Sequence, residues 1–320
     1  MLFLKGLAMG GADVVPGVSG GTIALITGIY EELIQTINQV NFSTIRLLFK
    51  GEFNSFWKAL NGNFLLVLIA GIVISFVSLA KVMTFLLENH PLLLWSFFFG
   101  LILASAWLIG KELKPFKLNY ALAIIAGAFV SYWITTISPS SSSDNLIYLF
   151  FSGMLAFCAM ILPGISGSFI LLLLGAYSTV IGAVGNLTSN FKESVIIVGS
   201  AVLGGITGLL IFSRLLKWLF EKYRRMTIAL MTGFLLGSLN KIWPWQKITN
   251  HMVKHEGTPD EELVIINFKN VLPSSYEKFE LIDGKLVYLS ADPQLGLAIA
   301  LCLAGFLTIF LLERLGRKFS

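Results

Sequence analysis

Long apolar runs separated by short polar loops dominate this chain. Six runs are long enough to cross a bilayer core of about 30 Å as helices. They are residues 64–79, 92–109, 120–137, 194–212, 227–240 and 294–312. Two further apolar regions, 2–37 and 146–182, are each interrupted near the middle by Pro and Gly. Because each half is too short to span the bilayer as a continuous helix, both regions are predicted to be re-entrant helical hairpins.

The two hairpins carry the same motif. Pro16-Gly17-Val18-Ser19-Gly20 recurs as Pro163-Gly164-Ile165-Ser166-Gly167, 147 residues later. Lys81 and Arg214 are also equivalent, at an offset of 133, which a shorter loop after the second hairpin explains. Three spans follow each hairpin, and an odd number of spans inverts the second copy relative to the first.

The predicted fold class is therefore an all-α polytopic membrane protein made of two inverted repeats. Each repeat consists of a re-entrant helical hairpin plus three transmembrane helices, and the repeats occupy residues 1–138 and 146–312. The polar segment 241–293 has no counterpart in the first repeat and is predicted to be a small extracellular lobe. Within it, apolar and polar residues flank Asp283-Gly284, a strong hairpin signal, so we expect a few β-strands.

Composition and charge agree with a membrane protein. Hydrophobic residues make up 56% of the chain and charged residues 13%, with a mean hydropathy of +0.81, far more apolar than a soluble domain. The net charge of +5 comes largely from Lys/Arg clusters between the apolar runs, which is a topology signal rather than a nucleic-acid interface. The alternation of these clusters predicts a multi-pass protein with cytoplasmic N- and C-termini. Neither Cys158 nor Cys302 has a partner nearby in the sequence, and both are interpreted as packing residues.

The breaks in the two hairpins are the candidate site. Non-helical backbone at membrane depth is tolerated only where it is packed in protein or lines a polar cavity. At each break, Pro16-Gly17 or Pro163-Gly164 ends the incoming helix. A serine then stands at the N-cap of the outgoing helix, whose free N–H groups attract anions. The predicted phosphate-binding residues of the two breaks are Ser19, Gly20, Gly21, Thr22, Ser166, Gly167 and Ser168. The alternative is that the glycines serve close helix packing, since Gly17-x-x-x-Gly21 is a small-xxx-small pattern.

A few ionisable residues extend this hypothesis. Lys81 and Arg214 lie near the ends of equivalent spans, where each could draw a phosphate from one leaflet or could simply snorkel to the interface. Asp13 and Glu31 bracket the first break only and are candidates for proton coupling, although Glu31 could instead mark the return of the hairpin to the surface.

No catalytic residue, metal ligand or cofactor is predicted. His251 and His255 are four residues apart in the polar lobe, but they lack the glutamate that a zinc-protease helix needs.

The motifs resemble a known family. The run from Gly10 to Thr22, GGADVVPGVSGGT, together with LPGISGS at 162–168, is similar to the PopT family of bacterial undecaprenyl-phosphate translocases, and the likeness covers nearly the whole chain. It implies a bacterial plasma-membrane lipid flippase that returns undecaprenyl phosphate from the outer to the inner leaflet for the synthesis of peptidoglycan and other envelope polymers. The implied partners are undecaprenyl phosphate and membrane lipids.

Two other functions stay open. Membrane undecaprenyl-pyrophosphatases of the BacA type share the Pro-Gly-x-Ser motif but continue it with Arg-Ser, whereas Gly20 and Gly167 stand here, so no arginine is present to neutralise transition-state charge. A small-anion transporter would use the same cradle without an opening to lipid. Oligomeric state, energy coupling and the direction of net transport are not readable from the sequence.

Overall fold

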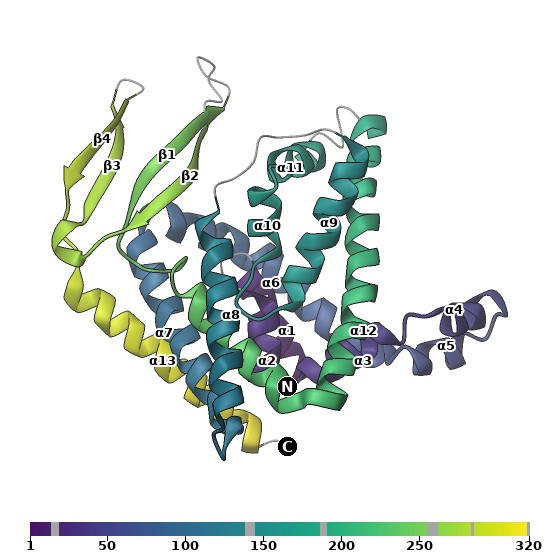
Figure 1. The fold of residues 1–320 in the computed structure, drawn as a ribbon. Helices are drawn as coiled ribbons and strands as arrows, with labels where there is room; N and C mark the ends of the chain where they lie inside the picture. The colour runs from purple at the N-terminus through teal and green to yellow at the C-terminus, as the bar shows by residue number, and fades with distance from the viewer. Residues whose placement is uncertain (14–18, 138–144, 186–190, 255–261, 283–284, 319–320) are drawn as a thin grey trace.

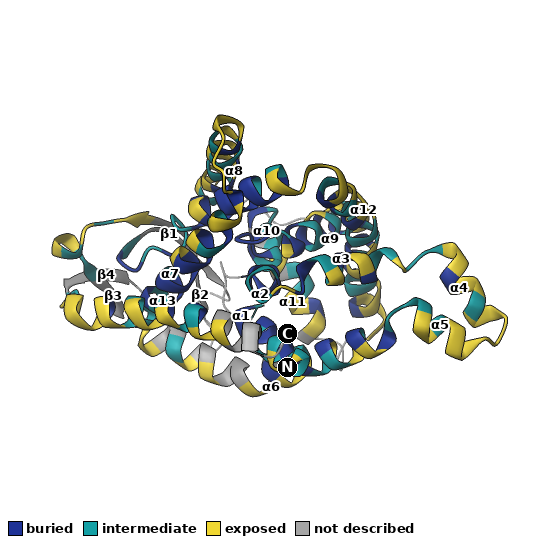
Figure 2. Ribbon diagram, turned by 90° about the horizontal axis from the view of Figure 1, so that it is seen from below, coloured by how far each residue is buried: buried dark blue, intermediate teal, exposed yellow. Residues whose placement is uncertain are grey.

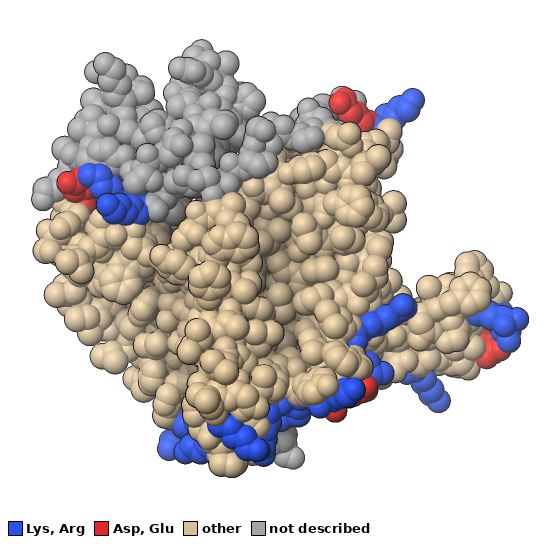
Figure 3. Space-filling view, in the orientation of Figure 1, with Lys and Arg blue, Asp and Glu red and all other residues tan. Residues whose placement is uncertain are grey.

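The computed structural model describes residues 1–13, 19–137, 145–185, 191–254, 262–282 and 285–318. Figure 1 shows a bundle of helices that carries β-hairpins at one end, while both chain termini lie at the opposite end. Lys and Arg side chains gather at the end with the termini, and the middle of the same face is almost free of charge (Figure 3). This is the charge distribution expected of a protein that spans a bilayer.

Short helices form the two regions that the sequence predicted to be hairpins. In the first region they are α1 (Leu2–Asp13), α2 (Gly20–Ile26) and α3 (Tyr30–Asn38). In the second they are α9 (Leu146–Ile161), α10 (Gly167–Leu173) and α11 (Tyr177–Gly185). The turns after α2 and α10 each contain a glycine with positive φ, Gly28 at 75° and Gly175 at 65°. The chain therefore turns in the same way after α2 and after α10.

The remaining helices include those that can cross a bilayer. They are α6 (Gly62–Asn89), α7 (Pro91–Gly110), α8 (Leu118–Thr136), α12 (Phe191–Ser238) and α13 (Leu295–Lys318). Non-helical backbone at Tyr223 (φ −133°, ψ 38°) divides α12 into two helical parts, which match two separate predicted spans. By length and composition, the described segments Pro91–Leu113, Leu118–Thr136 and Phe191–Ser238 can each cross a membrane. The chain is thus a helical membrane protein.

Two helices were not predicted. α4 (Phe42–Phe49) and α5 (Phe53–Ala59) project sideways from the bundle (Figure 1). Their apolar side chains are exposed, with Phe42 84% and Phe49 85% accessible, and basic residues lie between them. Exposed aromatic side chains beside lysine and arginine are typical of segments at the membrane surface.

The helices pack in four main pairs: α1 with α6, α9 with the first part of α12, α7 with α13, and α8 with the second part of α12. Glycines at these contacts let the backbones touch. A β-carbon would lie 1.9 Å from the Phe150 carbonyl oxygen at Gly204, 1.9 Å from that of Cys302 at Gly100, and 2.2 Å from that of Ile124 at Gly233. In each case the added β-carbon would meet main-chain atoms, which cannot move aside as a side chain can.

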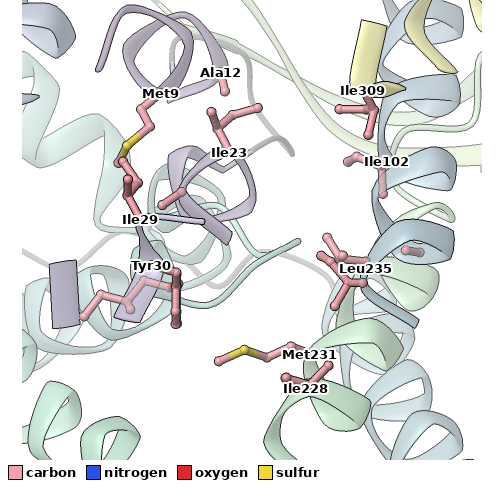
Figure 4. Close-up of a cluster of buried hydrophobic side chains, with 14 of the residues drawn as sticks. Met9, Ala12, Ile23, Ile29, Tyr30, Ile102, Ile228, Met231, Leu235 and Ile309 are labelled. Carbon is pink, nitrogen blue, oxygen red and sulfur yellow. The ribbon is translucent and has the colours of Figure 1, made fainter. Parts of the chain in front are cut away.

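The centre of the bundle is apolar. Figure 4 shows Met9, Ile23 and Tyr30 of the first region in one cluster with Met231 and Leu235 of α12. Seen from the end that carries the termini, buried residues lie inside the ring of helices and exposed residues face outward (Figure 2). In lipid, the exposed apolar side chains of the outer faces are in a favourable environment.

The polar lobe consists of two antiparallel hairpins. β1 (Gln246–Lys254) pairs with β2 (Glu262–Asn270), and β3 (Glu277–Ile282) pairs with β4 (Lys285–Ser290). The predicted strands are confirmed, while the Asp283-Gly284 turn lies outside the described residues. At the base of the lobe, the indole N–H of Trp245 donates to Pro293 O at 3.0 Å, and its ring packs with Leu92 of α7 and Ala298 of α13. The lobe is thereby fixed to the α7–α13 pair.

The glycine contacts generate a stability prediction. Replacing Gly204 with Val places side-chain atoms against the Phe150 carbonyl and should lower the free energy of unfolding by about 1–3 kcal/mol, or prevent folding. Gly199→Val is the matched control in the same helix, because a β-carbon there meets nothing within 4 Å. Thermal unfolding in detergent should separate the two variants; equal melting temperatures would show that the α9–α12 contact is not close-packed.

Candidate functional site

The two breaks contact each other directly. Ser19 Oγ donates to the carbonyl oxygen of Met160 at 3.0 Å, and the Tyr30 hydroxyl donates to that of Ile161 at 3.0 Å. In return, the N–H of Gly164 donates to Thr22 Oγ1 at 3.0 Å. The last carbonyls of α9 and the first N–H after Pro163 have no helical partner, so these bonds satisfy them from the other half of the chain. Two motifs about 140 residues apart thus form one site.

The N-terminus of α2 is already occupied. The N–H of Gly20 donates to Asp13 Oδ1 at 2.7 Å, the N–H of Gly21 to Ser19 Oγ at 3.1 Å, and the N–H of Thr22 to Ser19 O at 2.9 Å. A β-carbon on Gly20 would lie 2.5 Å from Asp13 Oδ2, so only glycine leaves room for the carboxylate. The side chain of Asp13 therefore stands where the sequence predicted a bound anion.

The second break differs from the first. Gly164 has φ +84°, a conformation that favours glycine, and Ser166 Oγ lies 2.8 Å from Ser168 Oγ. A β-carbon on Gly167 would lie 2.6 Å from the Ala156 carbonyl oxygen. Met160 is the counterpart of Asp13, and among the described residues no carboxylate bonds to this break. In the described part of the chain, an internal anion is therefore present at the first break and not at the second.

A small pocket adjoins the second break. Gly164, Ile165, Ser166 and Phe169 form one wall. The other walls come from Ser131, Ile134 and Thr135 of α8 and from Lys241, which lies in the turn after α12. The Lys241 ammonium lies 4.6 Å from the centre of the Phe169 ring, a cation–π arrangement. Burial lowers the pKa of Lys241 to about 8, because the pocket replaces part of the water around the ammonium.

Two polar side chains of α8 line the pocket. Ser131 is 1% exposed, and its Oγ has no hydrogen-bond partner among the described residues. Thr135 Oγ1 accepts a hydrogen bond of 2.8 Å from Asn240 Nδ2, and Asn240 in turn accepts two bonds of 2.9 Å from Asn270 Nδ2 of β2. The pocket thus combines a cation, an unpaired hydroxyl and a connection to the lobe.

Other predicted residues lie elsewhere or are not described. Pro16 and Gly17 lie outside the described residues, and of Lys81 only the position on α6 is described. Arg214 is exposed on α12. Glu31, on α3, forms an exposed ion pair with Arg224 (2.9 Å), which also contacts Glu112 at 3.2 Å. The structure therefore brings together Asp13, the first-break residues from Ser19 to Thr22 and the second break. Arg214 and Glu31 lie away from them.

Three residues that line the pocket, Lys241, Ser131 and Thr135, were not predicted from the sequence. Lys241 is the first residue of the polar segment and was assigned to the lobe, while Ser131 and Thr135 lie in a span whose polar positions were not analysed. Polar residues inside a predicted span are the signal that could have drawn attention to α8.

Together, the fold and the site define a class: a polytopic membrane protein in which two broken helical segments meet through polar contacts, an arrangement also found in transporters. A family profile matches residues 9–259, that of the VCA0040-like family, described as undecaprenyl phosphate translocase-like. The chain belongs to this family.

Curated relatives support the assignment. The chain is 42% identical to a polyprenyl-phosphate transporter of Vibrio cholerae over 316 residues, which cover 99% of this chain and 96% of the relative. It is 34% identical to a polyprenyl-phosphate transporter of Staphylococcus aureus over 253 residues, 75% of this chain and 85% of the relative. No solved structure matches the chain significantly.

The bond between the breaks can be tested by stability. Thr22→Val removes the acceptor of the buried Gly164 N–H and should destabilise the protein by about 1–3 kcal/mol. Thr207→Val is the control, because Thr207 is half-buried on α12 and its described hydrogen bond, to Leu203 O, stays within its own helix. The melting temperatures of both variants are measured in detergent, and only that of Thr22→Val should fall. An unchanged melting temperature for Thr22→Val would mean that the Gly164 N–H finds another partner.

Proposed function

We propose that this chain is a translocase that returns undecaprenyl phosphate from the outer to the inner leaflet of the bacterial plasma membrane. The observation that carries the proposal is the contact between the two breaks, where the Gly164–Thr22 and Ser19–Met160 bonds join the motifs beside a pocket that holds Lys241. The names of the two relatives point to the same lipid class. A phosphate on a long prenyl chain needs such a polar slot, because a dianion in hydrocarbon is very costly.

The mechanism that we propose is alternating access between inverted repeats. Its support is the packing pattern: α1 lies on α6 as α9 lies on the first part of α12, and α7 lies on α13 as the second part of α12 lies on α8. The last two pairs each join one half of the chain to the other. Rocking of such halves about the joined breaks would expose the slot to one leaflet at a time.

The proposed orientation places the termini in the cytoplasm and the β-hairpins outside. Its support is the concentration of Lys and Arg at the end with the termini (Figure 3), since cytoplasmic loops carry an excess of these residues. In this orientation α1–α3 form a re-entrant hairpin from the cytoplasm, and α9–α11 form one from outside. Substrate collected from the outer leaflet would meet the second break first.

Hydrolysis of a pyrophosphate is the less favoured function. The positions after Ser19 and Ser166 are glycines. A β-carbon at Gly167 would clash with the Ala156 carbonyl, and one at Gly20 would displace the Asp13 side chain, so this arrangement has no place for an arginine at either position. A small-anion transporter would use the same groups. It differs from the proposed translocase in its substrate, which is a free anion rather than a lipid phosphate.

Transport in liposomes tests the proposal. Purified protein should exchange undecaprenyl phosphate between leaflets without releasing phosphate from undecaprenyl pyrophosphate. The double variant Ser19→Leu, Ser166→Leu should lose at least about tenfold in rate, because it removes two hydroxyls and fills the site. Thr207→Leu, at a half-buried position of α12 outside the two breaks, should exchange normally. Phosphate release without exchange would identify a pyrophosphatase, and uptake of inorganic phosphate would identify an anion transporter.

Proton coupling, if present, is assigned to Asp13 rather than Glu31. Asp13 lies against the Gly20 N–H at the break, whereas Glu31 is held in an exposed ion pair. Asp13→Asn keeps a hydrogen-bond acceptor but cannot carry a proton, so it should abolish any response of exchange to a pH gradient. Glu31→Gln is the matched control and should keep the response. The opposite pattern would exclude Asp13 as the coupling residue.

A further inference from the structure

The pocket beside the second break is suited to one kind of ligand. Its described lining contains one ionisable side chain, Lys241, together with the hydroxyls of Ser131, Thr135 and Ser166. The described residues that line it include no acidic side chain. A cation beside several hydroxyl groups, in a partly dehydrated space, is complementary to a phosphate monoester, which offers acceptor oxygens and negative charge.

Ser131 gives independent evidence of a missing partner. Its Oγ is buried and has no hydrogen-bond partner among the described residues, although a serine in a helix can bond back to the carbonyl four residues earlier. Ser105 and Thr232, both buried in neighbouring helices, make that bond at 2.7 and 2.8 Å. A buried hydroxyl without a partner costs about 1–3 kcal/mol. The cost is removed when a ligand in the pocket accepts a hydrogen bond from Ser131.

The position of the pocket fits a lipid headgroup. Ser131 and Gly127 form the buried side of α8, whereas Phe129 and Trp133 on the same helix are 66% and 58% exposed. Figure 2 shows α8 at the edge of the bundle. A headgroup against the buried side of α8 is therefore one helix away from the apolar surface that an attached prenyl chain requires.

From these observations we propose that Lys241 and Ser131, with Ser166, form the site that binds the phosphate of a polyprenyl phosphate when it enters from the side of the β-hairpins. The inference rests on the proposed function and adds to it the two residues, Lys241 and Ser131, that hold the headgroup before it reaches the first break. There, the Asp13 carboxylate already occupies the Gly20 N–H, so an entering phosphate meets the second break while the first is closed to it.

Binding by purified protein in detergent is the direct test. Undecaprenyl phosphate, inorganic phosphate and undecaprenol are the probes, and dissociation constants are measured for each. Lys241→Gln should weaken the binding of undecaprenyl phosphate at least about tenfold, and Ser131→Ala about three- to tenfold. The matched controls are Lys192→Gln, an exposed lysine at the start of α12, and Ser96→Ala, a buried serine that bonds within α7. Both controls should bind normally.

The pH dependence provides a second readout that a merely structural lysine would not produce. The pKa of Lys241 is about 8, so its ammonium loses its proton as pH rises through that range, and binding should weaken between pH 7 and 9. The phosphate monoester, with a second pKa near 6, keeps its charge over this interval. Lys241→Arg stays protonated and should bind with a flat pH profile.

The results of these experiments distinguish failure of the inference from failure of the proposed function. Wild-type affinity in Lys241→Gln, in a protein whose liposomes exchange undecaprenyl phosphate, overturns the inference and leaves the proposed function intact. If the protein binds inorganic phosphate tightly through Lys241 but does not bind the lipid, the lipid assignment is wrong. If the wild type does not exchange undecaprenyl phosphate, the proposed function itself is wrong. Equal affinity for undecaprenol and undecaprenyl phosphate would show that the pocket does not recognise the phosphate group.

Discussion

The need to satisfy backbone groups at membrane depth is the constraint on which this structure depends. A helix that stops inside a bilayer leaves carbonyls and N–H groups without partners, and hydrocarbon supplies none. Here the chain ends two helices in the middle of the bundle, and each break supplies the hydrogen-bonding groups that the other lacks. Ser19 and Tyr30 serve the carbonyls at the end of α9, while Thr22 serves Gly164. These bonds favour a fold in which the two halves meet where the motifs lie.

The same requirement shapes the sequence around the breaks. Side chains that reach a foreign carbonyl must be short and polar, which favours Ser and Thr. The backbones must also come close enough for such short side chains to bridge them. A β-carbon on Gly21 would lie 2.5 Å from the Ile161 carbonyl oxygen, so a larger residue would separate the halves and break the bonds. The motif therefore specifies a contact between the two halves.

Much of the architecture was predictable, because lipid imposes a strong pattern on sequence. Each predicted span is helical in the structure, including the two that fall in α12 on either side of Tyr223. The motif repeat also indicated which segments would belong to the site. α4 and α5 were missed because seven or eight residues of mixed polarity give no signal that distinguishes a short helix from a loop. The hydrogen bond between Asp13 and the N-terminus of α2 was likewise not predictable, since it depends on how close Asp13 and Gly20 lie in space, which the sequence pattern does not show. Lys241 could not be placed from the sequence, because its surroundings come from α8 and α10, far away along the chain.

Asn240 connects α8 mechanically to the polar lobe. It holds Thr135 of α8 through its side chain and is held by Asn270 of β2 through both its oxygens. The lobe is itself anchored on α7 and α13 through Trp245. α8 is thus linked to the α7–α13 pair through Asn240 and the polar lobe. Any displacement of α8 at Thr135 must either break that link or pull the β-hairpins with it, so force applied to the lobe is transmitted to the wall of the pocket.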